Sequence, residues 1–313
     1  REMFTRFLFG TMIFSIIGIG ILQAVSVYAT SSKPVVVVNE NPEPQITQNV
    51  EYTIPFPHVD VFAKGAFLAK VNLATGSMTP LYVKNEHEKL PIASISKLLT
   101  AFISIQNKKL TDTFTISQWA ISGPWPSRKF QVGDTYTLRE LLEASLVESN
   151  NDAARVLAST VGERRFVQNM NMAASALALS ESSFFSSDGT DRVIDSQTVE
   201  NTSTPHDVAQ LITNLYRYAP DLLAVTTKPY VEIADVTGKQ VFTAYTTNRL
   251  MSFFSDGYTL LGGKTGTSLP ESKHLVLLFT DLTGEAYVSV VLDSIDNFAD
   301  TKLLLDTLIQ YKQ

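Results

Sequence analysis

The stretch that decides the fold is residues 91–102, which read PIASISKLLTAF. It places Ser94 three residues before Lys97 at the start of a predicted helix, and side chains at this spacing are neighbours on one helix face. Ile95 and Leu98 belong to an apolar series at helical spacing, which predicts a buried side. Burial disfavours a charged amine, so Lys97 is predicted to lose its proton near neutral pH and to act as a base for a Ser94 nucleophile. An ordinary amphipathic helix with both polar side chains in solvent is the alternative.

The composition excludes several classes of protein. The chain has 313 residues, of which 44% are hydrophobic, and this is enough for one sizeable core. A net charge of −6 without a basic cluster argues against a nucleic-acid partner. The absence of cysteine excludes disulfides, thiolate zinc sites and a cysteine nucleophile. The four histidines are scattered, so no metal site is predicted, and no cofactor is expected.

Residues 1–29 are predicted to form a membrane anchor or a signal segment. The run over residues 7–27 carries no charge, and its length of about 20 residues suffices to cross a bilayer as a helix. Arg1 and Arg6 precede it, which favours a cytoplasmic N-terminus and an extracytoplasmic body. Val27-Tyr28-Ala29 resembles a cleavage site, so we expect a single-pass protein of the cell membrane, or a secreted one.

The remaining chain is expected to hold one folded domain. Residues 30–59 are rich in proline and are predicted to be a linker, and residues 60–313 are predicted to fold. Strand patterns near both ends enclose a mostly helical middle, which predicts an α+β fold with one sheet from the N- and C-terminal parts and an inserted helical subdomain. The predicted strands are 63–73, 78–83, 239–246, 275–280 and 286–292; the predicted helices begin at Ser94, Leu138, Asp152, Thr204 and Lys302.

Two further polar clusters are candidates for chemistry. Ser149-Asn150-Asn151-Asp152 lies between two predicted helices, where its side chains either enter a cleft or cap the second helix. Residues 261–268 read LGGKTGTS, and their glycines permit close approach to a ligand. A phosphate loop is set aside here, because Tyr258 occupies the position of its first glycine.

Taken in order, Ser94–Lys97, Ser149–Asn151 and Lys264–Gly266 spell Ser-x-x-Lys, Ser-x-Asn and Lys-Thr-Gly. With their flanking residues, these motifs resemble the low-molecular-mass penicillin-binding proteins of the D-alanyl-D-alanine carboxypeptidase family, from about residue 60 to the C-terminus. The resemblance implies a β-lactamase/transpeptidase-like fold with an antiparallel sheet. It also implies a serine peptidase that trims peptidoglycan stem peptides through an acyl-enzyme and is inhibited by β-lactams.

The resemblance implies catalytic roles for three residues. Ser94 attacks the carbonyl between two D-alanines, Lys97 takes its proton, and Ser149 relays a proton. A serine needs such a base, and the resulting oxyanion needs fixed donors, which the backbone N–H groups of Ser94 and Thr267 supply.

The resemblance also implies a set of substrate-binding residues. Asn151 holds the substrate amide, and Lys264 keeps the site electropositive. Thr265 contacts the terminal carboxylate, and Gly266 and Thr267 complete the substrate-binding set.

Alternatives within the same family stay open. Related carboxypeptidases carry a carboxylate-binding arginine before the last helix, but residues 294–300 have none and no arginine follows Arg249, so a D,D-endopeptidase is an alternative. A class A β-lactamase needs a glutamate in Glu-x-x-Leu-Asn, a context that Glu163, Glu181 and Glu200 lack. A sensor that acylates without turnover is the non-enzyme alternative. A Ser-His-Asp esterase is disfavoured because no Gly-x-Ser-x-Gly occurs.

Overall fold

The computed structural model describes residues 55–106, 108–255, 257–269 and 271–312. The predicted anchor at residues 7–27 and most of the predicted linker lie outside these residues. Within the described ranges, no helix has the length and apolar character needed to cross a membrane. Packing of the described chain begins inside the stretch predicted as linker, because the Phe56 ring lies 5.3 Å from that of Tyr311 and Val59 is buried.

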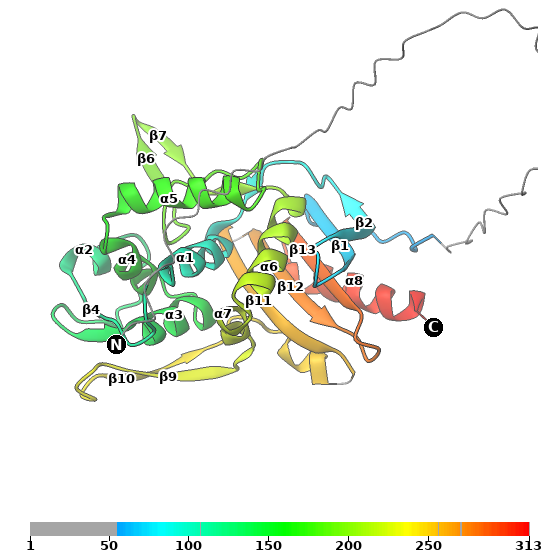
Figure 1. Ribbon diagram of the computed structural model, residues 1–313. Coiled ribbons are helices and arrows are strands. Elements are labelled where there is room, and N and C mark those ends of the chain that lie inside the picture. The colour runs from blue at the N-terminus through cyan, green and yellow to red at the C-terminus, as the bar shows by residue number, and fades with distance from the viewer. Residues whose placement is uncertain (1–54, 107, 256, 270, 313) are drawn as a thin grey trace, which may run out of the picture. The chain divides into compact units, whose positions relative to one another are not determined.

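A five-stranded antiparallel sheet forms the centre of the fold (Figure 1). Its order, β11-β12-β13-β1-β2, joins strands from both ends of the chain, which confirms the predicted sheet. In the central pairing, Gly65 lies opposite Leu292 and Val71 opposite Ala286. The strands are β1 (Gly65–Val71), β2 (Met78–Lys84), β11 (Thr259–Leu269), β12 (Ser272–Thr280) and β13 (Ala286–Ser294).

Alternation along the strands gives the sheet two apolar faces. On β12, Val276 and Leu278 join the large core shared with the helices, whereas Leu275 and Leu277 face the opposite side. Helix α6 (Pro205–Tyr218) covers the first face and α8 (Asn297–Tyr311) the second, as Figure 1 shows. Both faces are therefore buried, which explains why these strands carry so few charged residues.

The inserted chain between β2 and β9 is largely helical and packs beside the β11 edge (Figure 1). Its helices are η1 (Ala93–Ser96), α1 (Lys97–Ser104), α2 (Gln118–Ile121), α3 (Leu138–Val147), α4 (Asn151–Ser159), α5 (Glu163–Ala176), α6, α7 (Pro220–Ala224) and η2 (Val225–Thr227). Short paired strands connect them: β3 (Leu90–Pro91) with β8 (Thr202–Ser203), β4 (Thr113–Thr115) with β5 (Thr135–Thr137), and β6 (Arg192–Ile194) with β7 (Gln197–Val199).

Local sequence signals fix several helix ends as predicted. Thr137 accepts from the Glu140 N–H while the Glu140 carboxylate accepts from the Thr137 N–H, which is the capping box expected before Leu138. Thr204 caps α6, and Pro205 occupies the first turn, where no N–H is needed.

Several elements differ from the prediction. The closing helix, predicted from Lys302, already begins at Asn297 as α8. Ser94 lies in the 3₁₀ turn η1, and the α-helix itself begins only at Lys97. The strand predicted at 239–246 is β10 (Val241–Tyr245), which pairs with β9 (Tyr230–Ala234) outside the main sheet. The glycine-rich stretch 261–268 is part of the long edge strand β11, followed closely by β12. A short helix, η3 (Met251–Ser255), precedes β11.

Candidate active site

Ser94 and Lys97 are in direct contact. The Lys97 Nζ lies 2.7 Å from the Ser94 Oγ, and the Lys97 side chain is completely buried. Side chains at i and i+3 lie on one face of a 3₁₀ turn, so η1 and the first residue of α1 present the two groups to each other. Ala93 enters this turn with a φ of 43°, a left-handed conformation that costs energy for a residue with a side chain.

The surroundings of Lys97 favour its neutral form. Burial lowers the pKa of Lys97 to about 7; the Asp188 carboxylate raises it and Arg155 lowers it. Besides Ser94, the amine contacts the Asn151 Oδ1 at 2.7 Å and the Asp188 carbonyl oxygen at 2.5 Å, and both atoms only accept hydrogen bonds. A neutral amine that donates to these two oxygens directs its lone pair at the Ser94 hydroxyl. This is the arrangement of a general base beside a nucleophile.

Ser149 and Asn151, from the second sequence motif, face the same cleft as Ser94. Asn150 caps α4, whereas its neighbours Ser149 and Asn151 line the cleft, so both roles considered for this cluster occur in it. Ser149 has a φ of 64°, and its Oγ accepts from the Lys264 Nζ at 2.8 Å. Burial, together with repulsion from Lys97, lowers the pKa of Lys264 well below its ordinary value. Lys264 is therefore a weaker source of positive charge than the sequence motif implies.

Strand β11 packs tightly against the turn that carries Ser94. A Cβ on Gly266 would lie 2.7 Å from the Ile92 carbonyl oxygen, so only glycine fits here without displacing backbone. His274, which lies opposite Gly266 on β12, is buried. Its Nδ1 accepts a hydrogen bond from the Asp293 N–H at 3.0 Å. The Nε2 therefore carries the proton and donates to the Ser268 Oγ at 3.0 Å. Burial lowers the pKa of His274 to about 4, which keeps this ring neutral.

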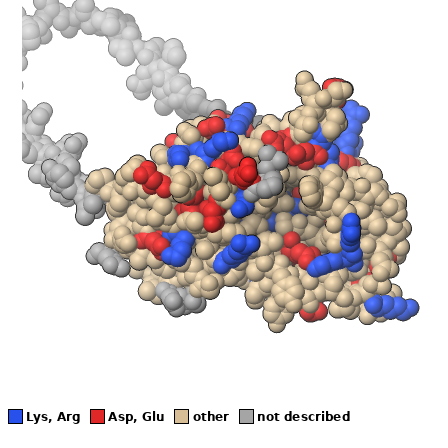
Figure 2. All heavy atoms as spheres, turned by 180° about the vertical axis from the view of Figure 1, so that it is seen from behind, with Lys and Arg blue, Asp and Glu red and all other residues tan. Residues whose placement is uncertain are grey.

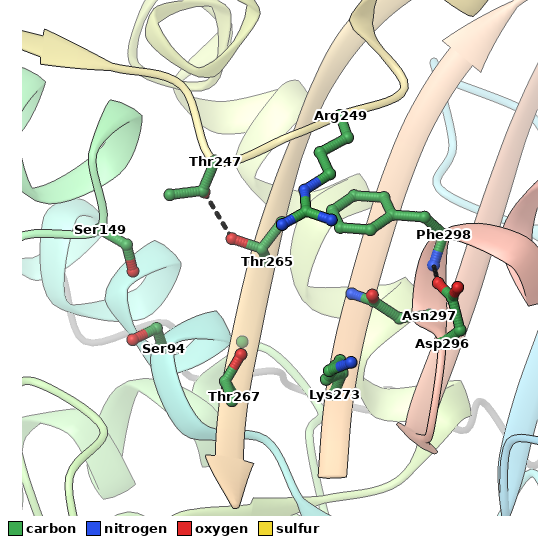
Figure 3. A pocket seen from close by; sticks show the side chains of 11 residues that line it. Ser94, Ser149, Thr247, Arg249, Thr265, Thr267, Lys273, Asp296, Asn297 and Phe298 are labelled. Atoms are coloured by element: carbon green, nitrogen blue, oxygen red, sulfur yellow. Dashed lines mark hydrogen bonds between the residues drawn. The ribbon is translucent and has the colours of Figure 1, made fainter. Parts of the chain in front are cut away.

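Two grooves meet at Ser94, and Ser149 and Thr267 also line both of them. The first, here called the basic groove, has a volume of about 340 Å³ and is also lined by Thr265, Gly266, Thr247, Arg249, Lys273, Asp296, Asn297 and Phe298 (Figure 3). The second, here called the Trp125 groove, has a volume of about 530 Å³ and is also lined by Pro124, Trp125, Asn151, Gly189, Thr190, Asp191 and Ser268. All predicted site residues except the buried Lys97 and Lys264 line one of the two grooves, and both lysines bond to serines that do.

The basic groove contains a cation that sequence reasoning missed. Arg249 lies between β10 and β11, and its guanidinium lies over the Phe298 ring at 5.5 Å, on the Thr265 side of the groove (Figure 3). Thr265 shares a 2.5 Å hydrogen bond with Thr247. The segment 294–300 lacks an arginine, but its Phe298 ring packs against the guanidinium of Arg249, which belongs to the chain before β11. The chain therefore carries a guanidinium in the groove despite the missing arginine.

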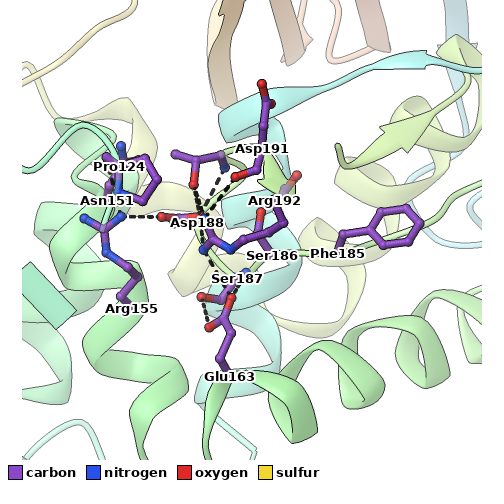
Figure 4. Close-up of polar contacts among 12 residues, drawn as sticks. Pro124, Asn151, Arg155, Glu163, Phe185, Ser186, Ser187, Asp188, Asp191 and Arg192 are labelled. Atoms are coloured by element: carbon purple, nitrogen blue, oxygen red, sulfur yellow. Dashed lines mark hydrogen bonds and ion pairs between the residues drawn. The ribbon is translucent and has the colours of Figure 1, made fainter. Parts of the chain in front are cut away.

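A buried ion-pair cluster lies beneath the site (Figure 4). Arg155 is 1% exposed and pairs with Asp152 at 2.5 Å and with Asp188 at 2.6 Å. Its guanidinium also donates to the carbonyl oxygens of Ala120 and Pro124. The other Asp188 oxygen lies 3.1 Å from Arg192. The cluster fixes the Asp188 carbonyl against Lys97 and joins the two walls of the Trp125 groove.

The comparisons with known proteins agree with this geometry. The profile of the D-alanyl-D-alanine carboxypeptidase family matches residues 55–295. The chain belongs to this family of serine peptidases. It resembles a D-alanyl-D-alanine carboxypeptidase from a Streptomyces species, with 27% identity over 236 residues that cover 70% of this chain and 78% of the relative.

Further relatives of this D-alanyl-D-alanine carboxypeptidase-family protein include an endopeptidase and a penicillin-binding protein. A D-alanyl-D-alanine endopeptidase from Pseudomonas aeruginosa is 28% identical over 233 residues, which cover 72% of this chain and 71% of the relative. A penicillin-binding protein from Listeria monocytogenes, solved in an ampicillin-bound form, superposes with a TM-score of 0.67 at 26% identity and covers 80% of this chain and 99% of its own. The fold is thus the penicillin-binding, transpeptidase-like α+β fold.

The pKa of Lys97 predicts how acylation depends on pH. With Lys97 as the predicted base, its neutral amine is the expected active form, so the rate of acylation should rise with pH through about 7 and level off above it. At pH 6 the rate constant should be roughly one-tenth of the plateau, because one pH unit below the pKa leaves about a tenth of the base neutral. Stopped-time labelling with fluorescent penicillin between pH 5 and 8.5 measures this. A rate that is flat across pH 6 to 8 would contradict the assignment of Lys97 as the base.

Proposed function

We propose that the protein is a serine-type D-alanyl-D-alanine carboxypeptidase that trims peptidoglycan stem peptides through an acyl-enzyme and is inhibited by β-lactams. The observation that carries this is the buried Lys97 amine, 2.7 Å from the Ser94 hydroxyl, at the junction of two grooves. The basic groove then holds the leaving D-alanine, and the Trp125 groove holds the peptide that becomes the acyl group.

We assign a residue to each step of the proposed reaction. Lys97 removes the Ser94 proton, and the Oγ attacks the carbonyl between the two D-alanines. The backbone N–H groups of Ser94 and Thr267 stabilise the oxyanion. Ser149, bonded to Lys264, delivers its proton to the amine of the departing D-alanine and takes in return the proton that Lys97 removed from Ser94, which makes Lys97 neutral again. Water then hydrolyses the ester and restores the Ser94 hydroxyl.

The basic groove suits the free carboxylate of the leaving D-alanine. Its charged lining residues are Arg249, Lys273 and Asp296, and the Asp296 carboxylate is used to cap α8. The groups that can bind a carboxylate are then Arg249, the Thr265 hydroxyl and Lys273, whose ammonium also donates to the Ile295 carbonyl oxygen at 2.8 Å. Arginine binds carboxylates through two parallel hydrogen bonds, which makes Arg249 the principal anchor.

An Arg249→Gln variant should lose roughly 10- to 100-fold in kcat/KM for a D-alanyl-D-alanine peptide, the cost of one charged hydrogen-bond pair. Arg249→Lys should recover part of the loss. Arg164→Gln, at an exposed position on α5, is the matched control and should keep the wild-type value. Steady-state assay of D-alanine release measures all three. Equal kcat/KM for Arg249→Gln and wild type would remove Arg249 from carboxylate binding.

Release of D-alanine from a pentapeptide substrate, together with labelling of Ser94 by fluorescent penicillin, tests the proposed function. Both are expected. Labelling without release would indicate the sensor, and rapid repeated hydrolysis of nitrocefin would indicate a β-lactamase. Among the described residues, Glu163, Glu181 and Glu200 are all absent from the lining of both grooves, which argues against the β-lactamase.

A D,D-endopeptidase is the second candidate. The Pseudomonas relative is named an endopeptidase, and a groove on each side of Ser94 accommodates peptide on both sides of the scissile bond. Mass spectrometry of crosslinked muropeptides after incubation with the protein separates the two activities. Conversion of dimers to monomers indicates the endopeptidase, and loss of terminal D-alanine alone indicates the carboxypeptidase.

The proposed site of action is outside the cytoplasmic membrane, with residues 7–27 as the anchor or as a removed signal. The support comes from the sequence of that segment and from the location of peptidoglycan. Membrane fractionation with protease protection of intact cells tests the location, and a cytoplasmic, protected body would contradict it.

The surface charge does not suggest a nucleic-acid partner. Acidic and basic side chains are interspersed on the face shown in Figure 2, which does not resemble a nucleic-acid-binding surface.

A further inference from the structure

The Trp125 groove differs in charge from the basic groove. Among its lining residues in the described chain, Asp191 is the one with a formal charge. The cleft is therefore positive on one side of Ser94 and negative on the other. A substrate that fills both grooves should carry charges in the opposite order, with its carboxylate at one end and a cation at the other.

The Asp191 carboxylate is available to a ligand. The neighbouring Arg192 guanidinium lies 3.1 Å from Asp188 and 3.4 Å from Glu163, and it donates to the backbone carbonyl oxygen of Asp191 at 3.3 Å. The Asp191 carboxylate itself is directed away from that cluster (Figure 4). Asp191 is exposed and makes no ion pair with any described residue. Its influence raises the pKa of Glu200, after the larger effect of burial, which indicates that negative charge concentrates near this wall.

Trp125 supplies the opposite wall of the same groove. Its side chain is 82% exposed, and its backbone has a φ of 51°, an uncommon conformation for a bulky residue. The Asn151 Nδ2 donates to the Trp125 carbonyl oxygen at 3.1 Å, so the second motif itself fixes this loop. An indole face attracts ammonium groups, and a carboxylate in the same groove adds a charged partner.

We infer that the Trp125 groove selects stem peptides whose residue before the D-alanyl-D-alanine unit bears a free side-chain ammonium, held between Trp125 and Asp191. This rests on the proposed function, which places the acyl part of the substrate in this groove. Two extended residues span about 7 Å, so a lysine-like side chain at that position starts within the groove and reaches its walls. The acidic and aromatic walls thereby set the substrate class, and the basic groove holds the invariant carboxylate end.

Two peptides that differ by one acetyl group test the inference. Nα-acetyl-L-lysyl-D-alanyl-D-alanine keeps its side-chain ammonium, whereas the Nα,Nε-diacetyl peptide does not. Wild-type protein should show at least a fivefold higher kcat/KM for the free amine. Asp191→Asn should narrow the ratio to less than twofold. Asp195→Asn, an exposed neighbour outside the lining of either groove, is the matched control and should keep the wild-type ratio.

A charge exchange separates recognition from a structural effect. Asp191→Lys should prefer a peptide whose lysine carries an Nε-succinyl group, because the ligand and the wall have then exchanged signs. Loss of fold cannot produce an inverted preference. Equal kcat/KM of wild type for the two acetylated peptides, or an unchanged ratio in Asp191→Asn, would overturn the inference.

Absence of D-alanine release from both peptides would instead count against the proposed function. The preference is then measured by how strongly each peptide slows labelling of Ser94 by fluorescent penicillin. Stronger protection by the free amine would support the groove assignment, and equal protection would overturn it.

Discussion

A Ser94→Ala variant should show no covalent labelling by fluorescent penicillin and no release of D-alanine, because no other hydroxyl contacts Lys97 among the described residues. Lys97→Met should label at least about a thousandfold more slowly, since the serine then lacks its adjacent base. Ser122→Ala and Lys302→Met change exposed residues of the same types and should behave as wild type. Persistent labelling of Ser94→Ala would refute the assignment of the nucleophile.

The Lys97→Met variant should also be at least as stable as wild type at pH 7. The pKa of Lys97 is lowered in the folded protein, so the unfolded chain binds more protons above pH 7 and the stability of wild type rises between about pH 7 and pH 10. A methionine at position 97 does not titrate, so it adds no pH dependence to the stability, and its burial does not require a charged group to lose its hydration. Urea denaturation at pH 7 and pH 9.5 should therefore show the advantage of the variant shrinking as pH rises. A large loss of stability would mean that Lys97 holds the fold as well as the chemistry.

An Arg155→Met variant should lower the free energy of unfolding by about 3–5 kcal/mol, the cost of leaving buried charges without a partner. Asp152 and Asp188 are both fully buried, and Arg155 pairs with each of them. Urea denaturation measures the loss. Arg165→Met, exposed on α5, is the matched control and should cost little.

The same substitution should move the pH dependence of acylation upward. Asp188 raises the pKa of Lys97 and Arg155 lowers it, so removal of Arg155 leaves the attraction of Asp188 unopposed. The half-maximal rate should then occur above pH 7. Adding Asp188→Asn to Arg155→Met should bring the midpoint back down and recover part of the stability. If the pH of half-maximal acylation is the same in both variants as in wild type, the cluster supports the fold without changing the pKa of Lys97.

The sequence predicted the parts of the site that local pattern determines. Ser94 and Lys97 are three residues apart, so any right-handed turn brings them together, and Thr137 and Pro205 mark helix starts through their own chemistry. The sheet from both chain ends followed from alternating apolar residues. The roles of the individual site residues stay proposals until they are tested by substitution.

The elements that escaped prediction depend on contacts distant in sequence. Gly262, Gly263 and Gly266 lower the strand propensity of β11, which forms because β12 and η1 pack against it. Arg249 lies in the basic groove with its guanidinium over the ring of Phe298, a residue of α8 that is distant in the sequence. Arg155 looks like a surface residue in a helical pattern, and its burial follows from Asp188, which a separate loop provides.

The pairing of β1 with β13 has a consequence for how the protein matures. Residues 65–71 cannot complete their sheet until residues 286–292 have been synthesised, so the central sheet cannot form while the C-terminal strands are missing. Such non-local topology slows folding, because loop closure over a long stretch precedes the stabilising contacts. Because β11 packs against the turn that carries Ser94, we expect the site around Ser94 to be assembled late in folding, once the C-terminal strands have joined the sheet.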